Sequence, residues 1–483
     1  MFTHLQWIDE QSGASSMPET RYIWHYVWAQ VFNLLNVERT EIFLRAYIIH
    51  YVQSISSFLM LFYFSKVFIR NLFTHISPLS LNYLGYWSTI IWFTVFANVS
   101  GYYQQVWILW YSVNYQISLP LTLLLTGLTI SLVFEDDSKK VKTITAVFII
   151  VLSYIILRLH AMEFIYYLMY MTVLMVIYMD KILLLWKKYI FFSLPATLFF
   201  IYSFLEFLEH IKTYAYRQSP IFNYLSFKKF PQFLEKVSSE GNIVVWHYNK
   251  VYYILNELIY LSLLFITILL LLVIIRHYKK YSDNINMRFV VFLLLTSLFI
   301  MIPVFQYTAG IASLLTYATV SYRFYYSALL FLAVPSFVFY LVSIFKIKNV
   351  LILNVILFTV LLGTFYYSKY NIEHHQNYYR NIISIKDALN SKKIGFNLSK
   401  ENIATIGQKL KYYESLNITG KPKYYYARDD IAFVVKFIYQ KPVFYARRGT
   451  LDYTKSYREH NNKKYYPVLF EVPENFPVYH RGR

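Results

Sequence analysis

Hydrophobic runs alternate with short charged loops along most of the chain, and this alternation restricts the fold more than any other feature. A helix needs roughly 17–25 apolar residues to cross about 30 Å of hydrocarbon. Each such run is predicted to be a helix, since lipid offers no partner for exposed backbone amides. Hydrophobic residues make up 57% of the chain, a share that suits helices with apolar surfaces on every side. The ten predicted spans are 42–64, 84–100, 116–134, 143–160, 163–180, 188–208, 254–275, 289–305, 323–345 and 350–366.

The positions of Lys and Arg in the connecting loops predict the orientation. Every second loop is basic, and these loops are predicted to be cytoplasmic: Lys66 and Arg70; Lys139, Lys140 and Lys142; Lys181, Lys187 and Lys188; Arg276, Lys279, Lys280 and Arg288; Lys346 and Lys348. The loops between them carry few cations, although the longer loop 209–253 is mildly basic. The segment before the first span and everything after residue 366 are therefore predicted to lie outside.

Three regions follow from this topology: an external segment 1–41, a transmembrane domain 42–366 and an extracytoplasmic domain 367–483. The last region carries 21 of the 46 basic residues and 10 of the 26 acidic ones, so more than half of the net charge of +20 resides there. A basic region tethered outside a membrane is expected to meet anionic lipid headgroups rather than nucleic acid. An amphipathic stretch at 401–415 and Tyr- and Val-rich segments near 423–427 and 442–446 predict a small α/β unit.

The sequence also constrains how the external regions fold and how they cross the membrane. The chain has no cysteine, so the external domain must rest on its own core and on docking to the membrane domain. Cysteine avoidance suits a bacterial envelope. Residues 1–10 lack the apolar region of a signal peptide. We therefore expect one further helix to precede the external segment.

Residues 16–36 predict a short helix at the outer surface. Ser16 and Glu19, with Pro18 between them, have the spacing of a capping box. An apolar stripe follows, with His25 at its flank and polar residues opposite it: Trp24, Val27, Trp28, Val31, Leu34 and Leu35 against Tyr26, Gln30 and Asn33. A Trp-rich stripe of this spacing is typical of a helix lying in the membrane interface. The alternative is a helix packed against the bundle.

The acidic pair Asp9-Glu10, followed by HYVWAQVFNLLNVERTEIFLRA leading into a span, resembles the opening of GT-C glycosyltransferases. The resemblance is closest to the branch with protein mannosyltransferases and the lipid A aminoarabinose transferase. It extends to YRFYYSALLFLAVP at 322–335 and to the tyrosine-rich tail. The resemblance implies an all-α polytopic membrane bundle with a small α/β extracytoplasmic domain. It also implies a catalytic Asp9 or Glu10, and Arg45 at the entrance of a span.

The resemblance implies a sugar donor linked to polyprenyl phosphate and a glycan, lipid or protein acceptor. Such an inverting transfer needs a carboxylate to deprotonate the acceptor and cations to receive the departing phosphate. Asp9 and Glu10 are the predicted catalytic residues, and the predicted donor-binding residues are Arg323, Arg158, Arg45, His160 and Glu163. No residue spacing predicts a metal site, because loop 101–115 lacks the second Asp of many family members. The cofactor stays open, a divalent cation included.

Each of these residues also has a structural alternative. Asp9 and Glu10 could be solvated residues of the N-terminal segment, and Arg45 could reach toward the interface or pair with Glu41 one helical turn away. The 158–163 turn could be a self-contained salt bridge.

Two other functions compete with the transferase. An envelope polysaccharide polymerase or ligase uses the same class of lipid-linked glycan, and loop 209–253 is the feature in its favour. A lipid-glycan flippase or transporter would carry charges at mid-bilayer, whereas the charges of this chain lie near the span ends. Substitution of the Asp9-Glu10 pair distinguishes these functions, because only the transferase needs it.

Overall fold

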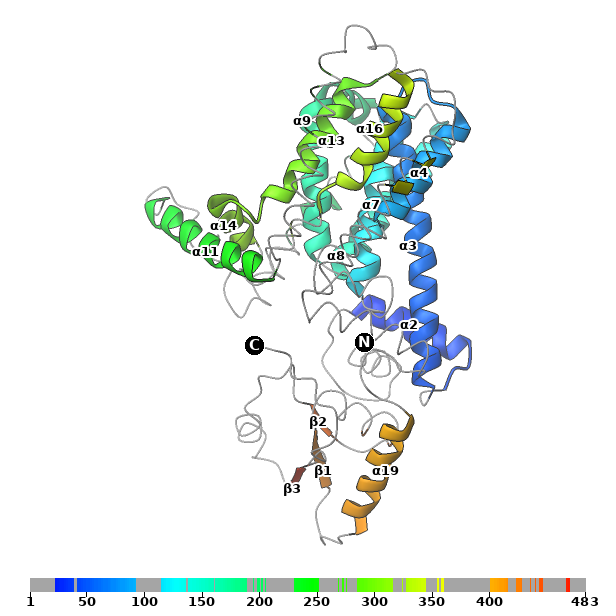
Figure 1. Cartoon of the computed structure of the whole chain (residues 1–483), viewed down its shortest axis with the longest axis vertical. Helices are drawn as coiled ribbons and strands as arrows, with labels where there is room; N and C mark the ends of the chain where they lie inside the picture. Colours follow the sequence, from blue (N-terminus) through cyan, green and yellow to red (C-terminus); the bar gives the residue numbers. More distant parts are fainter. Residues whose placement is uncertain are drawn as a thin grey trace. The chain divides into compact units, whose positions relative to one another are not determined.

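The computed structural model describes residues 22–38, 41–92, 114–135, 138–159, 161–188, 230–251, 285–315, 327–344 and 400–415, three short strands and a few single residues (Figure 1). Most of the described residues are helical. The chain divides into two compact units. The first contains α2 (Tyr22–Leu34), the beginning of α3 (Ile42–Leu72), α19 (Lys400–Ser415) and the strands. The second contains the rest of α3 and the other helices.

Among the described residues, four helices are long and apolar enough to cross a membrane, so the protein is a helical membrane protein. They are α3, α7 (Asn114–Phe134), α8 (Lys139–Leu159) and α9 (Ala161–Lys188). Their positions agree with four of the predicted spans. The predicted spans 188–208, 254–275 and 350–366 lie mostly outside the described residues.

Two shorter apolar helices, α4 (Pro78–Ile91) and α16 (Leu330–Ile344), pack against each other within the second unit. Helix α4 starts before the predicted residue 84, because Ser77 caps it and accepts a hydrogen bond from the Ser80 backbone at 3.1 Å. Pro78 suits the first helical position, where no backbone donor is needed. Residues 93–113, which include the end of the predicted span 84–100, lie outside the described part of the chain.

The core of the second unit is built from aromatic side chains of helices distant in sequence. The ring of Phe68 on α3 lies 5.6 Å from Phe289 and 5.8 Å from Phe292, both on α13 (Met287–Ser297). Phe64 meets Phe331 of α16 at 6.3 Å, and Gly127 lets α7 approach the backbone of α3 at Phe64. Lipid tails are as apolar as these rings, so close van der Waals packing stabilises the core.

Segments that the sequence predicts as cytoplasmic meet at one end of the second unit. Arg70, near the end of α3, forms an ion pair of 2.9 Å with Glu135, which follows α7. The Asn286 backbone amide donates to the Leu72 carbonyl at 2.9 Å. Within α9, the Tyr170 hydroxyl donates to the Ser327 carbonyl at 2.6 Å. The contacts of Arg70 and Asn286 thus join segments that are predicted to lie on the same side, and the topology itself stays a prediction.

The predicted span 289–305 corresponds to two helical segments and ends at a bend. Helix α13 continues into the 3₁₀ helix η6 (Leu298–Met301), and the chain then bends by 88° into α14 (Gln306–Leu315). Pro303 lies in the turn between them and cannot donate a backbone hydrogen bond. The hydroxyl of Thr308 donates to the carbonyls of Ile302 and Phe305, at 2.8 and 3.1 Å, so backbone groups at the bend are satisfied.

The tail contains α19 and three strands, β1 (Lys423–Ala427), β2 (Val443–Tyr445) and β3 (Tyr466–Leu469). They form a parallel sheet in the order β2-β1-β3, with Tyr425 of β1 opposite both Val443 and Val468. Helix α19, β1 and β2 lie at the positions expected from the sequence. That 367–483 is one extracytoplasmic α/β domain stays a prediction.

Candidate functional site

Helix α2 buries only part of the predicted apolar stripe. Trp24 and Trp28 are buried, together with His25, Ala29 and Phe32. The ring of His25 lies edge-on to Trp24, with the centroids 4.9 Å apart. The rest of the stripe is exposed, in particular Val27, Leu34 and Leu35. The stripe is thus divided into a buried aromatic face, as the packed alternative expects, and an exposed aliphatic edge, as an interfacial helix requires.

The turn after α2 redirects the chain into α3. Asn36 adopts the left-handed conformation with φ 51°, which asparagine tolerates better than most residues. The Val37 amide donates to the Phe32 carbonyl at 3.0 Å, which closes the end of α2 in the manner of a Schellman motif. A sharp corner therefore joins the surface helix to the first predicted span.

Arg45 in the first turn of α3 holds this corner together. Its side chain is buried, donates to the Val37 carbonyl at 2.7 Å and lies over the Phe32 ring at 4.9 Å. The Glu41 carboxylate accepts a hydrogen bond from the Glu38 backbone amide at 3.3 Å. The Arg45 side chain is therefore packed within the corner rather than exposed at its surface. The structure thus holds a guanidinium at the point where a surface helix enters a span.

Arg158 and Glu163 lie on either side of the junction between α8 and α9. Arg158 is exposed in the last turn of α8, with its guanidinium 5.4 Å from the Tyr154 ring centre. Glu163 is buried in the first turn of α9, and its backbone carbonyl accepts from the Thr122 hydroxyl at 3.3 Å. A cation at a helix C-terminus and an anion at an N-terminus are both favoured by the helix dipole. The helix dipole therefore favours both positions.

The other predicted site residues, Asp9, Glu10, His160 and Arg323, lie outside the described residues. Of those described, Arg45 belongs to the first unit, whereas Arg158 and Glu163 belong to the second. In the described part of the chain, no three His, Asp or Glu side chains lie together where they could hold a metal ion.

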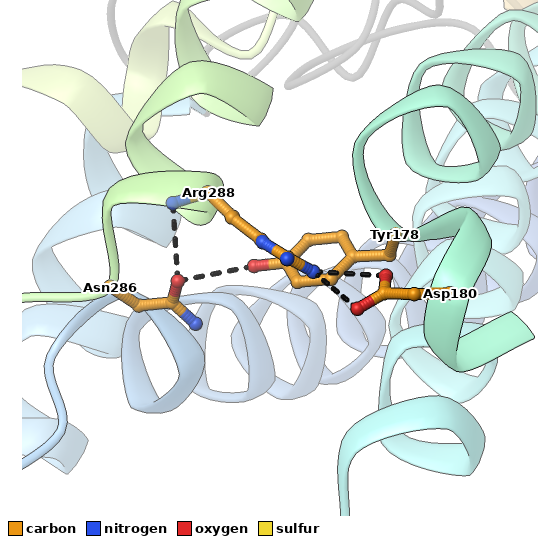
Figure 2. Close-up of polar contacts among 4 residues, drawn as sticks. All are labelled: Tyr178, Asp180, Asn286 and Arg288. Carbon is orange, nitrogen blue, oxygen red and sulfur yellow. Dashed lines mark hydrogen bonds and ion pairs between the residues drawn. The ribbon is translucent and has the colours of Figure 1, made fainter.

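A polar cluster that the sequence did not predict joins α9 to α13 (Figure 2). Helix α9 kinks at Tyr178, whose hydroxyl donates to the Asn286 side chain at 3.2 Å. Asn286 also caps α13 by accepting from the Arg288 backbone amide. The guanidinium of Arg288 reaches across to Asp180. The only sequence signal was an acid at the end of one apolar run and an arginine at the start of another. Because the ion pair is half exposed and its groups engage one another, we interpret the cluster as a structural fastening.

Comparison of the chain with protein-family models, with curated proteins and with solved structures finds no match.

Proposed function

We propose that the protein is a membrane glycosyltransferase that moves a sugar from a polyprenyl-phosphate donor to an envelope glycan, lipid or protein. The reaction inverts the anomeric carbon: the acceptor attacks it, Asp9 or Glu10 takes the acceptor proton, and polyprenyl phosphate departs with the bonding electrons. Arg45, Arg158 and Arg323 are the cations available to the phosphate, with His160 and Glu163 beside them in sequence.

One observation carries the proposal: a buried arginine at the corner between an amphipathic helix and a span. A donor headgroup emerges from lipid at this depth, and a guanidinium is the side chain best suited to phosphate. The hydrogen bond from Arg45 to Val37 and the ring of Phe32 fix the orientation of the guanidinium. Such preorganisation favours charge that develops on a leaving group.

The proposal includes ten spans with the N-terminal segment, loop 209–253 and the 367–483 domain outside the cytoplasm. Its support is the charge of the loops, together with contacts that join predicted cytoplasmic segments to one another. Cysteines introduced at Ser15 and Ser391, in a chain without cysteine, should both react with an impermeant thiol reagent in intact cells. Labelling at one of the two sites alone contradicts this topology.

Transfer assays on the full-length protein test the proposed chemistry. With a polyprenyl-phosphate sugar as donor, Asp9→Asn should reduce turnover by about two to four orders of magnitude, the usual contribution of a general base. Arg45→Lys and Arg323→Ala should instead weaken donor binding, since neither variant offers the planar fork of arginine. Arg70→Gln is the matched control, because Arg70 lies half exposed beside Glu135 at the predicted cytoplasmic end. Wild-type transfer by Asp9→Asn and Arg45→Lys would rule out the assignment.

A polysaccharide polymerase or ligase is the second candidate, and one observation favours it. Loop 209–253, which is where such an enzyme would carry its reactive residues, contains a long helix, α11 (Phe230–Val251). In that case the Asp9-Glu10 pair would tolerate substitution, whereas substitutions on α11 would abolish polymer formation. The same set of variants therefore separates the two functions.

A further inference from the structure

Helices α11 and α14 form a tight antiparallel pair within the second unit (Figure 1). Gly241 of α11 faces Gln306, whereas Gly310 of α14 faces Val237, so the two helices run in opposite directions. At both glycines a side chain would overlap a backbone carbonyl of the other helix. The two helices therefore touch backbone to backbone and behave as one piece.

Polar side chains of this pair form hydrogen bonds between the two helices and an ion pair within α11. The Gln306 side chain donates to the Ser238 carbonyl at 3.2 Å, and the Ser313 hydroxyl donates to the Glu240 carboxylate at 3.2 Å. Lys236 pairs with the same carboxylate at 2.7 Å. The surfaces that face away from the contact are thus left to interact with the surroundings.

Those two outer surfaces differ in chemistry. On α14, Tyr307 and Ile311 are 59% and 45% exposed. On α11, polar and apolar residues are exposed in equal number: Gln232, Glu235, Ser239 and Asn242, and Pro231, Leu234, Ile243 and Trp246. The difference lies in charge: α11 carries Glu235, Lys236 and Glu240, whereas α14 has no charged residue, so α14 is the less polar side of the pair.

The direction of α14 relates this helix pair to the bilayer. Its axis is bent by 88° from α13 and η6, which make up most of the predicted span 289–305. The exposed apolar surface of that span, at Val291 and Leu298, continues through Phe305 onto α14. A helix perpendicular to a span lies along the membrane surface, and continuity with the lipid-facing side chains places lipid against α14.

We propose that α11 and α14 form a two-layer interfacial helix pair, in which α14 lies in the boundary between headgroups and acyl chains and α11 covers it on the water side. Trp246 and Tyr307 suit this depth, where aromatic residues with polar groups are enriched. The alternative is a helix pair that enters the hydrocarbon. It would carry Glu235, Lys236 and Glu240 into lipid, where such charges are rare and costly. The proposal does not depend on transferase activity.

Spin labels in the full-length protein test the proposal, because the chain has no cysteine of its own. Single cysteines at Tyr307 and Ile311 report on α14, and matched ones at Ser239 and Asn242 report on α11. All four positions are exposed, so the labels should not disturb the fold. In lipid nanodiscs, the collision rates of each label with oxygen and with a water-soluble nickel chelate give its depth.

We expect the α14 labels to collide several-fold more with oxygen than with nickel, at depths of about 5–10 Å below the headgroups, and the α11 labels to show the reverse. If the nickel chelate reaches all four labels, the helix pair is exposed to water on both sides and the proposal is wrong. If all four labels collide more with oxygen than with nickel, both helices lie in the hydrocarbon and the proposal is also wrong. Protection of the α14 labels from both reagents would show that a protein surface covers α14.

Discussion

Arg288 of α13 holds Asp180 of α9 through a single guanidinium nitrogen that lies 2.9 Å from each carboxylate oxygen. Both side chains are more than half exposed. An exposed ion pair contributes little to stability and is screened by salt. The fastening of α9 to α13 therefore depends mainly on the buried neighbour, Tyr178, whose ring contacts Phe134 and Phe289.

This difference yields the first prediction. Tyr178→Ala should destabilise the protein by about 3–5 kcal/mol, the usual cost of removing a large buried aromatic side chain. Asp180→Asn should shift the unfolding temperature only slightly, and less at high salt. Thermal unfolding in detergent at two salt concentrations measures both. An Asp180→Asn effect as large as that of Tyr178→Ala would contradict the prediction.

The second prediction concerns the close contact between α11 and α14. Gly241→Ala places a methyl group against the Gln306 backbone carbonyl, which cannot move aside as a flexible side chain would. We expect the helices to separate, at a cost of about 1–3 kcal/mol. Asn242→Ala, on the exposed side of the same helix turn, is the control and should be nearly neutral. Hydrogen–deuterium exchange of 230–251 should increase in the first variant and stay unchanged in the control.

Asn36 provides the third prediction. At φ 51°, glycine is free of strain, whereas a β-branched residue is not. Asn36→Gly should therefore leave stability nearly unchanged, and Asn36→Val should cost about 1–2 kcal/mol. Protease resistance of the α2–α3 corner in the full-length protein distinguishes the two variants. Equal resistance of both would show that the corner does not need this conformation.

Gln53 gives a prediction of the opposite sign. It is buried in α3, and neither its amide oxygen nor its amide nitrogen has a hydrogen-bond partner among the described residues. Leaving a polar group buried and unsatisfied costs about 1–3 kcal/mol. Gln53→Leu should therefore raise the unfolding temperature, as measured in the same detergent. A lower unfolding temperature would indicate that the amide makes a stabilising contact in the membrane.

The last prediction concerns pH. The Tyr439 hydroxyl donates to the Ile403 carbonyl of α19 at 2.8 Å, and burial raises the pKa of Tyr439 above its usual value. The stabilising effect of the neutral phenol is therefore complete below about pH 10, the unfolded pKa, and is lost as the pH rises through the folded pKa. Proteolysis should cut α19 faster at pH 10.5 than at pH 8 in the wild type. Tyr439→Phe should show faster cleavage already at pH 8 and a weaker dependence on pH.

Features that depend on local composition could be predicted from the sequence. The spans that became α3, α7, α8 and α9 are continuous apolar runs, and α19 and β1 follow patterns of a few residues. The bend after η6 could not be predicted, because hydropathy reports that residues are apolar but not which way the helix axis points. Pro303 ends a helix without fixing the direction of the next one.

The polar cluster that was not predicted depends on contacts across long sequence distances. Asp180 and Arg288 are 108 residues apart, and neither shows its partner in the local sequence. For α2, periodicity correctly predicted a helix with an apolar stripe but not which part of it becomes covered. That is why Trp24 is buried while Leu34, on the same predicted stripe, is exposed.

The order of the strands in the tail has a consequence for how the chain is made. The central strand, β1, precedes both of its neighbours in sequence, so it cannot complete its pairing until Leu469 has been synthesised. Parallel pairing over such distances is also slow. The helices of the membrane domain are inserted earlier in synthesis. Closure of the sheet is therefore a late event in the synthesis of the chain.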